Sequence, residues 1–184
     1  MGMARCAINP QTMQHNKFKI VKAKKAKKVA IVGAGIGGME AARVLALRGH
    51  IPVIFEKSEK LGGVFNAAAA PEFKEKDKEL LAWYAKELKD LNIEVRFNSE
   101  ITSQEQLSDF DDVIVATGSI PNKPRIPGLE KAIEACDYLY GKEVGDKVII
   151  IGGGLTGCEI AYDLFKKGKT PIIIEMKNDL IAVK

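Results

Sequence analysis

The chain has 184 residues, of which 46% are hydrophobic and 28% charged, proportions that are typical of a globular protein. It contains no apolar run long enough to cross a bilayer and no secretory signal pattern, so we expect neither a membrane partner nor secretion. Its three cysteines, Cys6, Cys136 and Cys158, form neither a CxxC motif nor a disulfide framework, which favours a cytoplasmic location.

The net charge of +4 is unevenly distributed along the chain. Residues 1–28 contain Arg5 and seven lysines but no acidic residue, whereas the remaining residues carry a net charge of −4. A basic segment can bind nucleic acid, but neither interleaved aromatic residues nor a nucleic-acid-binding motif accompanies this one. We interpret residues 1–27 as a solvated basic arm and expect no nucleic-acid partner.

The first predicted unit begins with the apolar run of residues 29–32, which is typical of a buried parallel strand. The run leads into a GxGxxG pattern, and we predict that a helix follows, ending before Gly49. A second apolar strand, residues 51–55, ends at Glu56. Glycines in this spacing permit a tight turn, close approach of a pyrophosphate and close packing of the helix. The acid lies at the distance expected for a bond to a ribose 2′-hydroxyl.

Three further elements are predicted before the pattern returns. A stretch around residues 73–92 places Leu80, Leu81, Tyr84, Leu88 and Leu91 at helical spacing. Residues 93–97 alternate between apolar and polar side chains and predict a strand. Another apolar strand, residues 113–116, runs into an Ala-Thr-Gly sequence that is followed by a proline-rich stretch.

The second predicted unit repeats the first at an offset of 119 residues, without a gap. The matched positions in the two copies are Gly33, Gly35, Gly38, Ala42, Gly49 and Glu56, and Gly152, Gly154, Gly157, Ala161, Gly168 and Glu175. Six matches in two copies predict two dinucleotide sites. The fold class we predict is α/β, a Rossmann-like three-layer fold with a parallel sheet and two βαβ units, the second incomplete.

The order of these motifs resembles that of flavoprotein reductases with two dinucleotide sites. This resemblance implies that the first unit holds FAD and the second holds NAD(H). The residues assigned to FAD by this resemblance are Gly33, Gly35, Gly37, Gly38, Glu56, Lys57, Gly62, Gly63, Ala116, Thr117 and Gly118. Those assigned to the pyridine nucleotide are Gly152, Gly154, Gly157, Glu159 and Glu175. Glu159 is equally well interpreted as a surface carboxylate, and Glu175 favours NADH over NADPH although Lys177 follows closely.

A closer resemblance, to the 2-enoate reductase family, covers nearly the whole chain. Its motifs here are RCAINP, the stretch from LGGVFN to NSEIT, and GKEVGDKVIIIGGGLTGCEIAYDL. Relatives include 2,4-dienoyl-CoA reductase and trimethylamine dehydrogenase, which carry an FMN-binding barrel and a [4Fe–4S] cluster ahead of this region. The resemblance implies that hydride passes from NADH to FAD, and that electrons then pass through the cluster to FMN, where an enoate is reduced.

The same resemblance assigns Cys6 as the fourth ligand of the iron–sulfur cluster, because Cys6-Ala7-Ile8-Asn9-Pro10 matches the family's C-x-x-N-P. One cysteine cannot hold four irons, so the other ligands and the FMN barrel would belong to a longer parent chain. In this interpretation residues 1–27 form the arm, 28–128 the FAD unit and 129–184 the truncated nucleotide unit. No catalytic residue is assigned in this chain, and a homo-oligomer is compatible with the sequence.

Two other interpretations stay open. The chain could be a nucleotide-binding piece without turnover of its own, because the parts that carry the chemistry are missing. It could also be a stand-alone FAD-dependent pyridine nucleotide oxidoreductase similar to thioredoxin reductase, although the lack of a CxxC motif disfavours thiol chemistry.

Overall fold

The computed structural model describes residue 6 and residues 11–181. Contacts between residues divide the chain into two units. The first contains the described residues up to Gly63 together with Ala82–Gly118, and the second contains Val64–Leu81 and the described residues from Ser119 onward. Each unit has its own parallel sheet.

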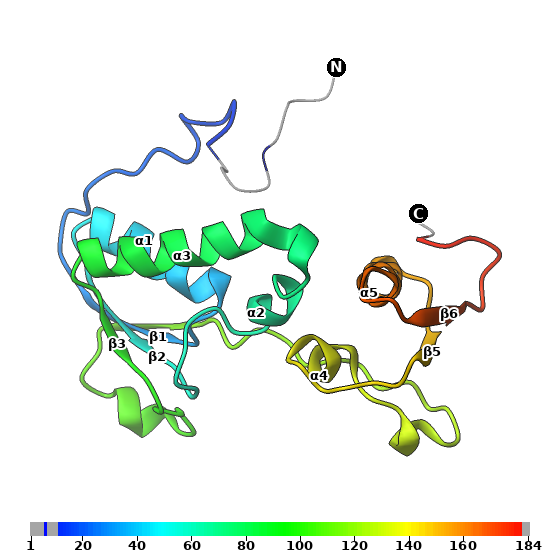
Figure 1. Cartoon of the computed structure of the whole chain (residues 1–184). Helices are drawn as coiled ribbons and strands as arrows, with labels where there is room; N and C mark the ends of the chain where they lie inside the picture. Colours follow the sequence, from blue (N-terminus) through cyan, green and yellow to red (C-terminus); the bar gives the residue numbers. More distant parts are fainter. Residues whose placement is uncertain (1–5, 7–10, 182–184) are drawn as a thin grey trace. The chain divides into compact units, whose positions relative to one another are not determined.

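The sheet of the first unit has the strand order β3-β2-β1-β4, with all neighbours parallel. Figure 1 labels β1, β2 and β3 of this sheet. Its strands are β1 (Lys28–Val32), β2 (Ile51–Phe55), β3 (Glu94–Arg96) and β4 (Asp112–Val115). In the observed register, Val32 pairs with both Phe55 and Val115. The carboxyl ends of β1, β2 and β4 therefore meet at one edge of the sheet, which is where parallel sheets bind ligands.

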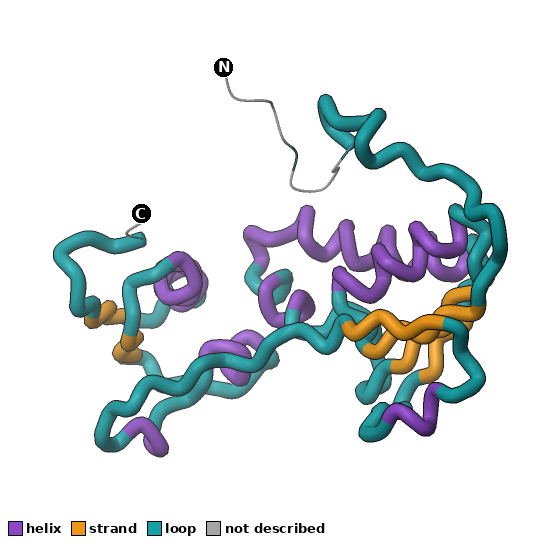
Figure 2. The backbone as a smooth tube through the Cα atoms, turned by 180° about the vertical axis from the view of Figure 1, so that it is seen from behind, coloured by secondary structure: helices purple, strands orange, loops and turns teal. Residues whose placement is uncertain are grey.

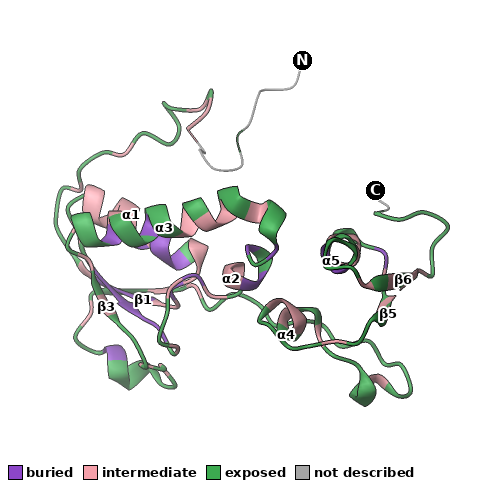
Figure 3. Ribbon diagram, viewed as in Figure 1, coloured by how far each residue is buried: buried purple, intermediate pink, exposed green. Residues whose placement is uncertain are grey.

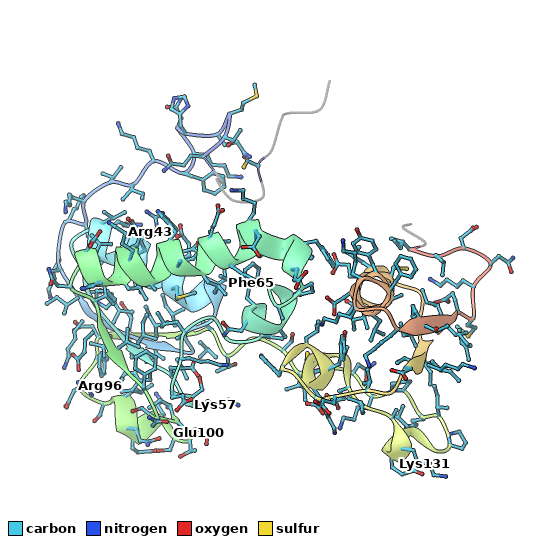
Figure 4. The ribbon with its side chains drawn as sticks, viewed as in Figure 1. Arg43, Lys57, Phe65, Arg96, Glu100 and Lys131 are labelled. Atoms are coloured by element: carbon cyan, nitrogen blue, oxygen red, sulfur yellow. The ribbon has the colours of Figure 1, made fainter. Side chains whose placement is uncertain are left out.

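Helices cover one face of this sheet. Helix α1 (Ile36–Leu47) contacts β1, β2 and β4, and it is joined to α3 (Glu75–Asp90) by a hydrogen bond from Tyr84 to Glu40. Figure 2 shows the two helices running along the same side of the strands. Arg43, labelled in Figure 4, adds an ion pair with Glu87 across the helix pair.

The opposite face of the sheet is covered by the segment around the 3-10 helix η2 (Gln104–Leu107). Leu107 joins Ala30, Val53 and Phe55 in a buried cluster. Strand β1 is buried over Val29, Ala30 and Ile31, as the sequence predicts, because both faces are covered (Figure 3). This rigid sheet holds the loops at its carboxyl edge.

The second unit contains a two-stranded parallel sheet formed by β5 (Lys147–Ile151) and β6 (Thr170–Ile174). Helix α5 (Leu155–Lys166) connects the strands, and α4 (Ala135–Leu139) contacts both α5 and α2 (Phe65–Ala68). Two short 3-10 helices, η1 (Glu72–Lys74) and η3 (Leu129–Lys131), complete the unit. Both predicted βαβ units are therefore present, and both long connecting helices end before a left-handed glycine, Gly49 or Gly168.

One prediction about the second unit is wrong. The apolar run of β5 predicts a strand buried on both faces, but Ile149 is 62% exposed and Ile151 is 56% exposed. Burial alternates along both β5 and β6, because α5 covers one face and the described residues supply no cover for the other.

No helix among the described residues is both long enough and apolar enough to cross a bilayer.

Candidate functional site

The first glycine loop joins the end of β1 to the start of α1. Gly33 has a φ of +106°, which favours glycine, and a Cβ placed there would lie 2.5 Å from the carbonyl oxygen of Ala116. A Cβ at Gly38 would lie 1.9 Å from the carbonyl oxygen of Gly33, so helix and strand pack too closely for any side chain. By contrast, a Cβ at Gly35 or Gly37 would meet no atom within 4 Å. The outer side of the loop is open.

The start of α1 is left without a side-chain cap. Gly35 is the N-cap residue and supplies no capping hydrogen bond, and the first turn contains no acidic residue. The first N–H groups of a helix have no partner within the helix and attract anions. Open space beside uncapped N–H groups suits a pyrophosphate, so the residues present fit a dinucleotide.

The second glycine loop reproduces this geometry between β5 and α5. Gly152 has a φ of +109°, and a Cβ at Gly157 would lie 2.0 Å from the carbonyl oxygen of Gly152. Gly154 is the N-cap residue of α5, again without a side-chain cap, and a Cβ there would meet no atom within 4 Å. The two loops therefore offer the same kind of phosphate cradle.

Glu56 is bound to the first loop by its carboxylate. Its Oε2 accepts a hydrogen bond from the backbone N–H of Ala34 at 2.8 Å, and its Oε1 accepts bonds from the N–H and the hydroxyl of Ser58, both at 2.8 Å. The residue is only 6% exposed. Burial alone would raise the pKa of Glu56, but these hydrogen bonds and the charge of Lys57 outweigh it and lower the pKa, which keeps the carboxylate ionised.

Glu175 is bound to the second loop in the same way. Its Oε2 accepts a hydrogen bond from the N–H of Gly153 at 2.6 Å, and its Oε1 accepts one from the N–H of Lys177 at 2.8 Å. The bond from Lys177 contributes most to lowering the pKa of Glu175, followed by the bond from Gly153. Sequence reasoning assigned both acids to ribose, but it missed Ser58 and the bonds by which the acids fix the loops. Ala34 and Gly153, which donate to these acids, are themselves 119 residues apart. The repeat therefore indicates that a bond from loop to acid found in one unit recurs in the other.

Two further segments enclose the first loop. The N–H of Gly62 donates to the carbonyl of Ala34 at 2.8 Å, and Gly62 forms an isolated bridge with Gly35. A Cβ at Gly63 would lie 3.3 Å from the Cα of Gly35. On the β4 side, the atoms nearest a Cβ at Gly33 belong to Ala116 and Thr117.

The predicted FAD residues are thus mostly brought together. Two of them, Gly33 and Gly35, belong to the first loop, and four others lie against it: Gly62, Gly63, Ala116 and Thr117. Gly118 follows in a left-handed conformation. Lys57 is exposed and labelled in Figure 4 in the loop after β2. The contacts that enclose the loop do not involve Lys57 or Gly118.

Glu159 lies on the second turn of α5 and is paired with a cation. Its Oε1 accepts a hydrogen bond from Nζ of Lys74 at 2.7 Å, and both side chains are partly exposed, Glu159 at 31% and Lys74 at 23%. Next to this pair, the rings of Phe73 and Tyr162 meet edge to face with centroids 5.1 Å apart. The pairing of Lys74 with Glu159 was not predicted, because the two residues lie 85 positions apart in the sequence.

Cys6 is the residue predicted to ligate an iron–sulfur cluster. Cys6 is exposed, and among residue 6 and residues 11–181 no three His, Cys, Asp or Glu side chains are grouped to hold a metal ion. The remainder of its motif, residues 7–10, lies outside the described residues. Ligation by Cys6 stays a prediction.

Known proteins similar to this chain include several oxidoreductases. A cinnamate reductase from Clostridium sporogenes is 46% identical over 97% of this chain and 27% of its own length. An NADH oxidase from Thermoanaerobacter brockii is 42% identical over 96% of this chain and 28% of its own. A solved complex of 2-naphthoyl-CoA reductase with 2-naphthoyl-CoA superimposes with a TM-score of 0.88 at 32% identity, covering 96% of this chain and 28% of that one.

These relatives confirm the expected resemblance to reductases of the 2-enoate type, and the chain spans about a quarter of their length. A family model described as pyridine nucleotide-disulphide oxidoreductase matches residues 6–109 and, in a second alignment, residues 27–183. The second match covers most of the chain, including both glycine loops and both acids. The chain therefore belongs to the pyridine nucleotide-disulphide oxidoreductase family.

Proposed function

We propose that this chain is the FAD- and NADH-binding electron-transfer part of an oxidoreductase that reduces activated C=C bonds. The first glycine loop holds FAD and the second holds NADH. The observation that carries this assignment is the enclosure of the first loop. Gly62 forms a bridge with Gly35, and the atoms nearest a Cβ at Gly33 belong to Ala116 and Thr117. Such enclosure suits a tightly held cofactor. The order of the two loops along the chain, which resembles that of flavoprotein reductases with two dinucleotide sites, supports NADH at the second loop.

In the first site, the uncapped N–H groups of α1 bind the pyrophosphate, and Gly35 and Gly37 leave room for it. The ionised carboxylate of Glu56 retains acceptor capacity beyond its three protein hydrogen bonds and accepts from the adenosine ribose. Because Glu56 is also bonded to Ala34, binding of ribose and shaping of the phosphate loop depend on one side chain.

In the second site, Gly154 and the N–H groups of α5 have the corresponding role, and Glu175 accepts from the ribose of NADH. Glu175 is held by Gly153 and Lys177, so the carboxylate does not turn away easily. A 2′-phosphate would meet a fixed negative charge, which disfavours NADPH. The ion pair with Lys74 fixes the direction of Glu159 on α5, and Glu159 is the candidate for the nicotinamide end.

Bound at the first loop, FAD would supply hydride acceptance from NADH and release of single electrons. Two similar proteins support a C=C substrate for the complete enzyme, because one is named cinnamate reductase and the other 2-naphthoyl-CoA reductase. We further propose that an FMN barrel of the same parent chain is the partner, that Cys6 completes a [4Fe–4S] cluster beside it, and that the enzyme is cytoplasmic. The thioredoxin-reductase-like alternative is weaker, because Cys136 and Cys158 lie on different helices and form no disulfide.

Two matched alanine substitutions test the assignment. Gly35 and Gly154 have φ values of −69° and −71°, which alanine adopts readily, and a Cβ at either would enter open space. The folded chain should therefore tolerate both changes while the methyl group occupies phosphate space. Gly35→Ala should weaken FAD binding at least about tenfold, or about 1.4 kcal/mol, and leave NADH binding unchanged. Gly154→Ala should do the reverse.

Calorimetric titration with each ligand measures these effects, and circular dichroism verifies that both variants are folded. If both substitutions weakened the same ligand, or neither weakened FAD, the assignment would be wrong. For Cys6, iron analysis of a full-length parent protein carrying Cys6→Ala is the corresponding test. A full complement of four irons per chain would remove Cys6 from the ligand set.

A further inference from the structure

Ser58 binds the carboxylate of Glu56 through its backbone and through its side chain. The N–H and the hydroxyl of Ser58 both donate to Oε1 of Glu56, each at 2.8 Å. The other oxygen, Oε2, accepts the N–H of Ala34 in the first glycine loop, also at 2.8 Å. An ionised carboxylate offers about two acceptor positions on each oxygen. Ser58 therefore occupies both positions of Oε1, whereas one position of Oε2 is left.

The hydroxyl of Ser58 lies near two acceptors. Besides Oε1 of Glu56, the carbonyl oxygen of Lys60 lies 3.0 Å from it, but a hydroxyl carries only one proton. Glu56 is the closer acceptor, and its lowered pKa keeps it ionised. Because a charged acceptor binds a donor more strongly than a neutral carbonyl does, the proton is shared with Oε1.

The backbone around Ser58 is fixed without this hydroxyl. The N–H of Glu56 donates to the carbonyl of Arg96 at 2.9 Å, and the carbonyl of Glu56 accepts the N–H of Ser99 at 2.9 Å. The carbonyl of Ser58 accepts the N–H of Asn98 at 3.0 Å. These bonds to β3 and the segment that follows it hold the turn by main-chain atoms alone.

The second unit contains the same turn without a hydroxyl. Lys177 follows Ser58 by the 119 residues of the repeat. The N–H of Lys177 donates to Oε1 of Glu175 at 2.8 Å, as the N–H of Ser58 does to Glu56. Because lysine makes this turn as well as serine, the hydroxyl of Ser58 is not needed for the turn. Its effect falls on the carboxylate of Glu56.

We propose that Ser58 is a positioning residue of the first site and determines which oxygen of Glu56 binds the adenosine ribose. Because Ser58 occupies Oε1, the ribose is bound through Oε2, the oxygen that is also bonded to Ala34 in the glycine loop. Glu56 then accepts from one ribose hydroxyl, the 2′-hydroxyl in dinucleotide sites of this type. The inference rests on the proposed binding of FAD at the first loop.

Substitution of Ser58 should change which ribose hydroxyls contribute to binding. Ser58→Ala keeps the backbone N–H bond and opens one acceptor position on Oε1, so Glu56 can accept from the 3′-hydroxyl as well as the 2′-hydroxyl. Ser58→Thr retains a hydroxyl and should keep Oε1 occupied. Neither change removes a bond that fixes the backbone of the turn.

The experiment compares ADP, 2′-deoxy-ADP and 3′-deoxy-ADP as ligands. They are titrated calorimetrically into the Gly154→Ala chain, in which the second loop is blocked, with and without Ser58→Ala or Ser58→Thr. With Ser58 in place, loss of the 2′-hydroxyl should weaken binding about tenfold, and loss of the 3′-hydroxyl should leave it unchanged. In Ser58→Ala, loss of either hydroxyl should weaken binding about tenfold. Ser58→Thr should keep the pattern seen with Ser58.

Three results would overturn the proposal: dependence on the 3′-hydroxyl with Ser58 in place, no such dependence in Ser58→Ala, or the Ser58→Ala pattern in Ser58→Thr. Circular dichroism verifies that the variants are folded. The failure of the underlying assignment is seen separately. If FAD bound to the Gly35→Ala chain as tightly as to the wild type, the first loop would not be the FAD site, whatever the response to the deoxy ligands.

Discussion

The carboxylate of Glu56 lies 2.8 Å from the backbone nitrogen of Ala34, in the middle of the first glycine loop. The acid at the end of β2 is therefore part of the loop's own structure, in addition to its proposed role in binding ribose. Glu175 repeats the arrangement with Gly153 at 2.6 Å. Each acid connects the ends of two parallel strands, and this connection makes the conformation of each loop sensitive to a single side chain.

Glu56→Gln should destabilise the protein. A glutamine amide has one acceptor oxygen, so either the N–H of Ala34 or the donors of Ser58 would face an NH₂ group. A buried donor without a partner costs about 1–3 kcal/mol. Urea denaturation of wild type and variant measures the loss. Glu175→Gln is the matched control, and its more exposed site should give a smaller loss. Equal losses would mean that burial does not decide the effect.

Acid should destabilise the wild type more steeply than Glu56→Gln. The folded pKa of Glu56 lies below its ordinary value near 4.5, so the unfolded chain takes up the proton first as the pH falls. The stabilisation is present above that value and is lost as the pH falls through the folded pKa. Unfolding free energies between about pH 6 and pH 3 should therefore decline with a larger slope in the wild type. Identical slopes would show that another carboxylate dominates.

The free energy of unfolding should decrease in alkali because of Tyr84. Burial, followed by the charge of Glu40 and the hydrogen bond to it, raises the pKa of Tyr84 to about 12. Between about pH 10 and pH 12 the unfolded chain loses the phenol proton while the folded chain retains it, so stability falls with rising pH. Tyr84→Phe should flatten this decline. Because the chain has four tyrosines, the difference between the absorbance titrations of the wild type and Tyr84→Phe provides an independent measurement of the Tyr84 phenol, and an ordinary pKa near 10 would contradict the prediction.

The pair between Lys74 and Glu159 should contribute little to stability. Both side chains are partly exposed, and such pairs are typically worth about 0.2–1 kcal/mol. A double-mutant cycle with Lys74→Met and Glu159→Gln measures the coupling. If the pair orients Glu159 toward NADH, Lys74→Met should weaken NADH binding while leaving FAD binding unchanged. Lys76→Met, which breaks a more exposed pair with Glu79, is the control and should affect neither ligand.

Glu175 should decide between NADH and NADPH. Its carboxylate is ionised and fixed by two backbone N–H groups, so removing it relieves repulsion of a 2′-phosphate. We expect Glu175→Ala to reduce the preference for NADH at least about tenfold, measured as the ratio of the two dissociation constants. Lys177 follows closely and would then be available to the phosphate. An unchanged ratio would assign the preference to another residue.

The sequence alone determined the two βαβ units, because their signals are local. The period of the apolar runs, the spacing of Gly33, Gly35 and Gly38, and the glycines that end the helices all act within a few residues. These features were predicted and agree with the structure. The repeat also predicted the equivalence of Glu56 and Glu175, since an acid at a fixed distance after a strand lies at the same edge of any parallel sheet.

The tertiary structure alone decided which distant residues meet. Lys74 and Glu159 lie 85 positions apart in the sequence, and no periodic pattern predicts their pairing. No local pattern predicts the bonds from Gly62 to Ala34 and from Ile181 to Gly153 either. The exposure of Ile149 likewise could not be predicted. An apolar run shows that a strand is suited to burial on both faces, but packing determines whether both faces are covered. Local patterns therefore located the loops and acids, whereas long-range packing determined how each loop is enclosed.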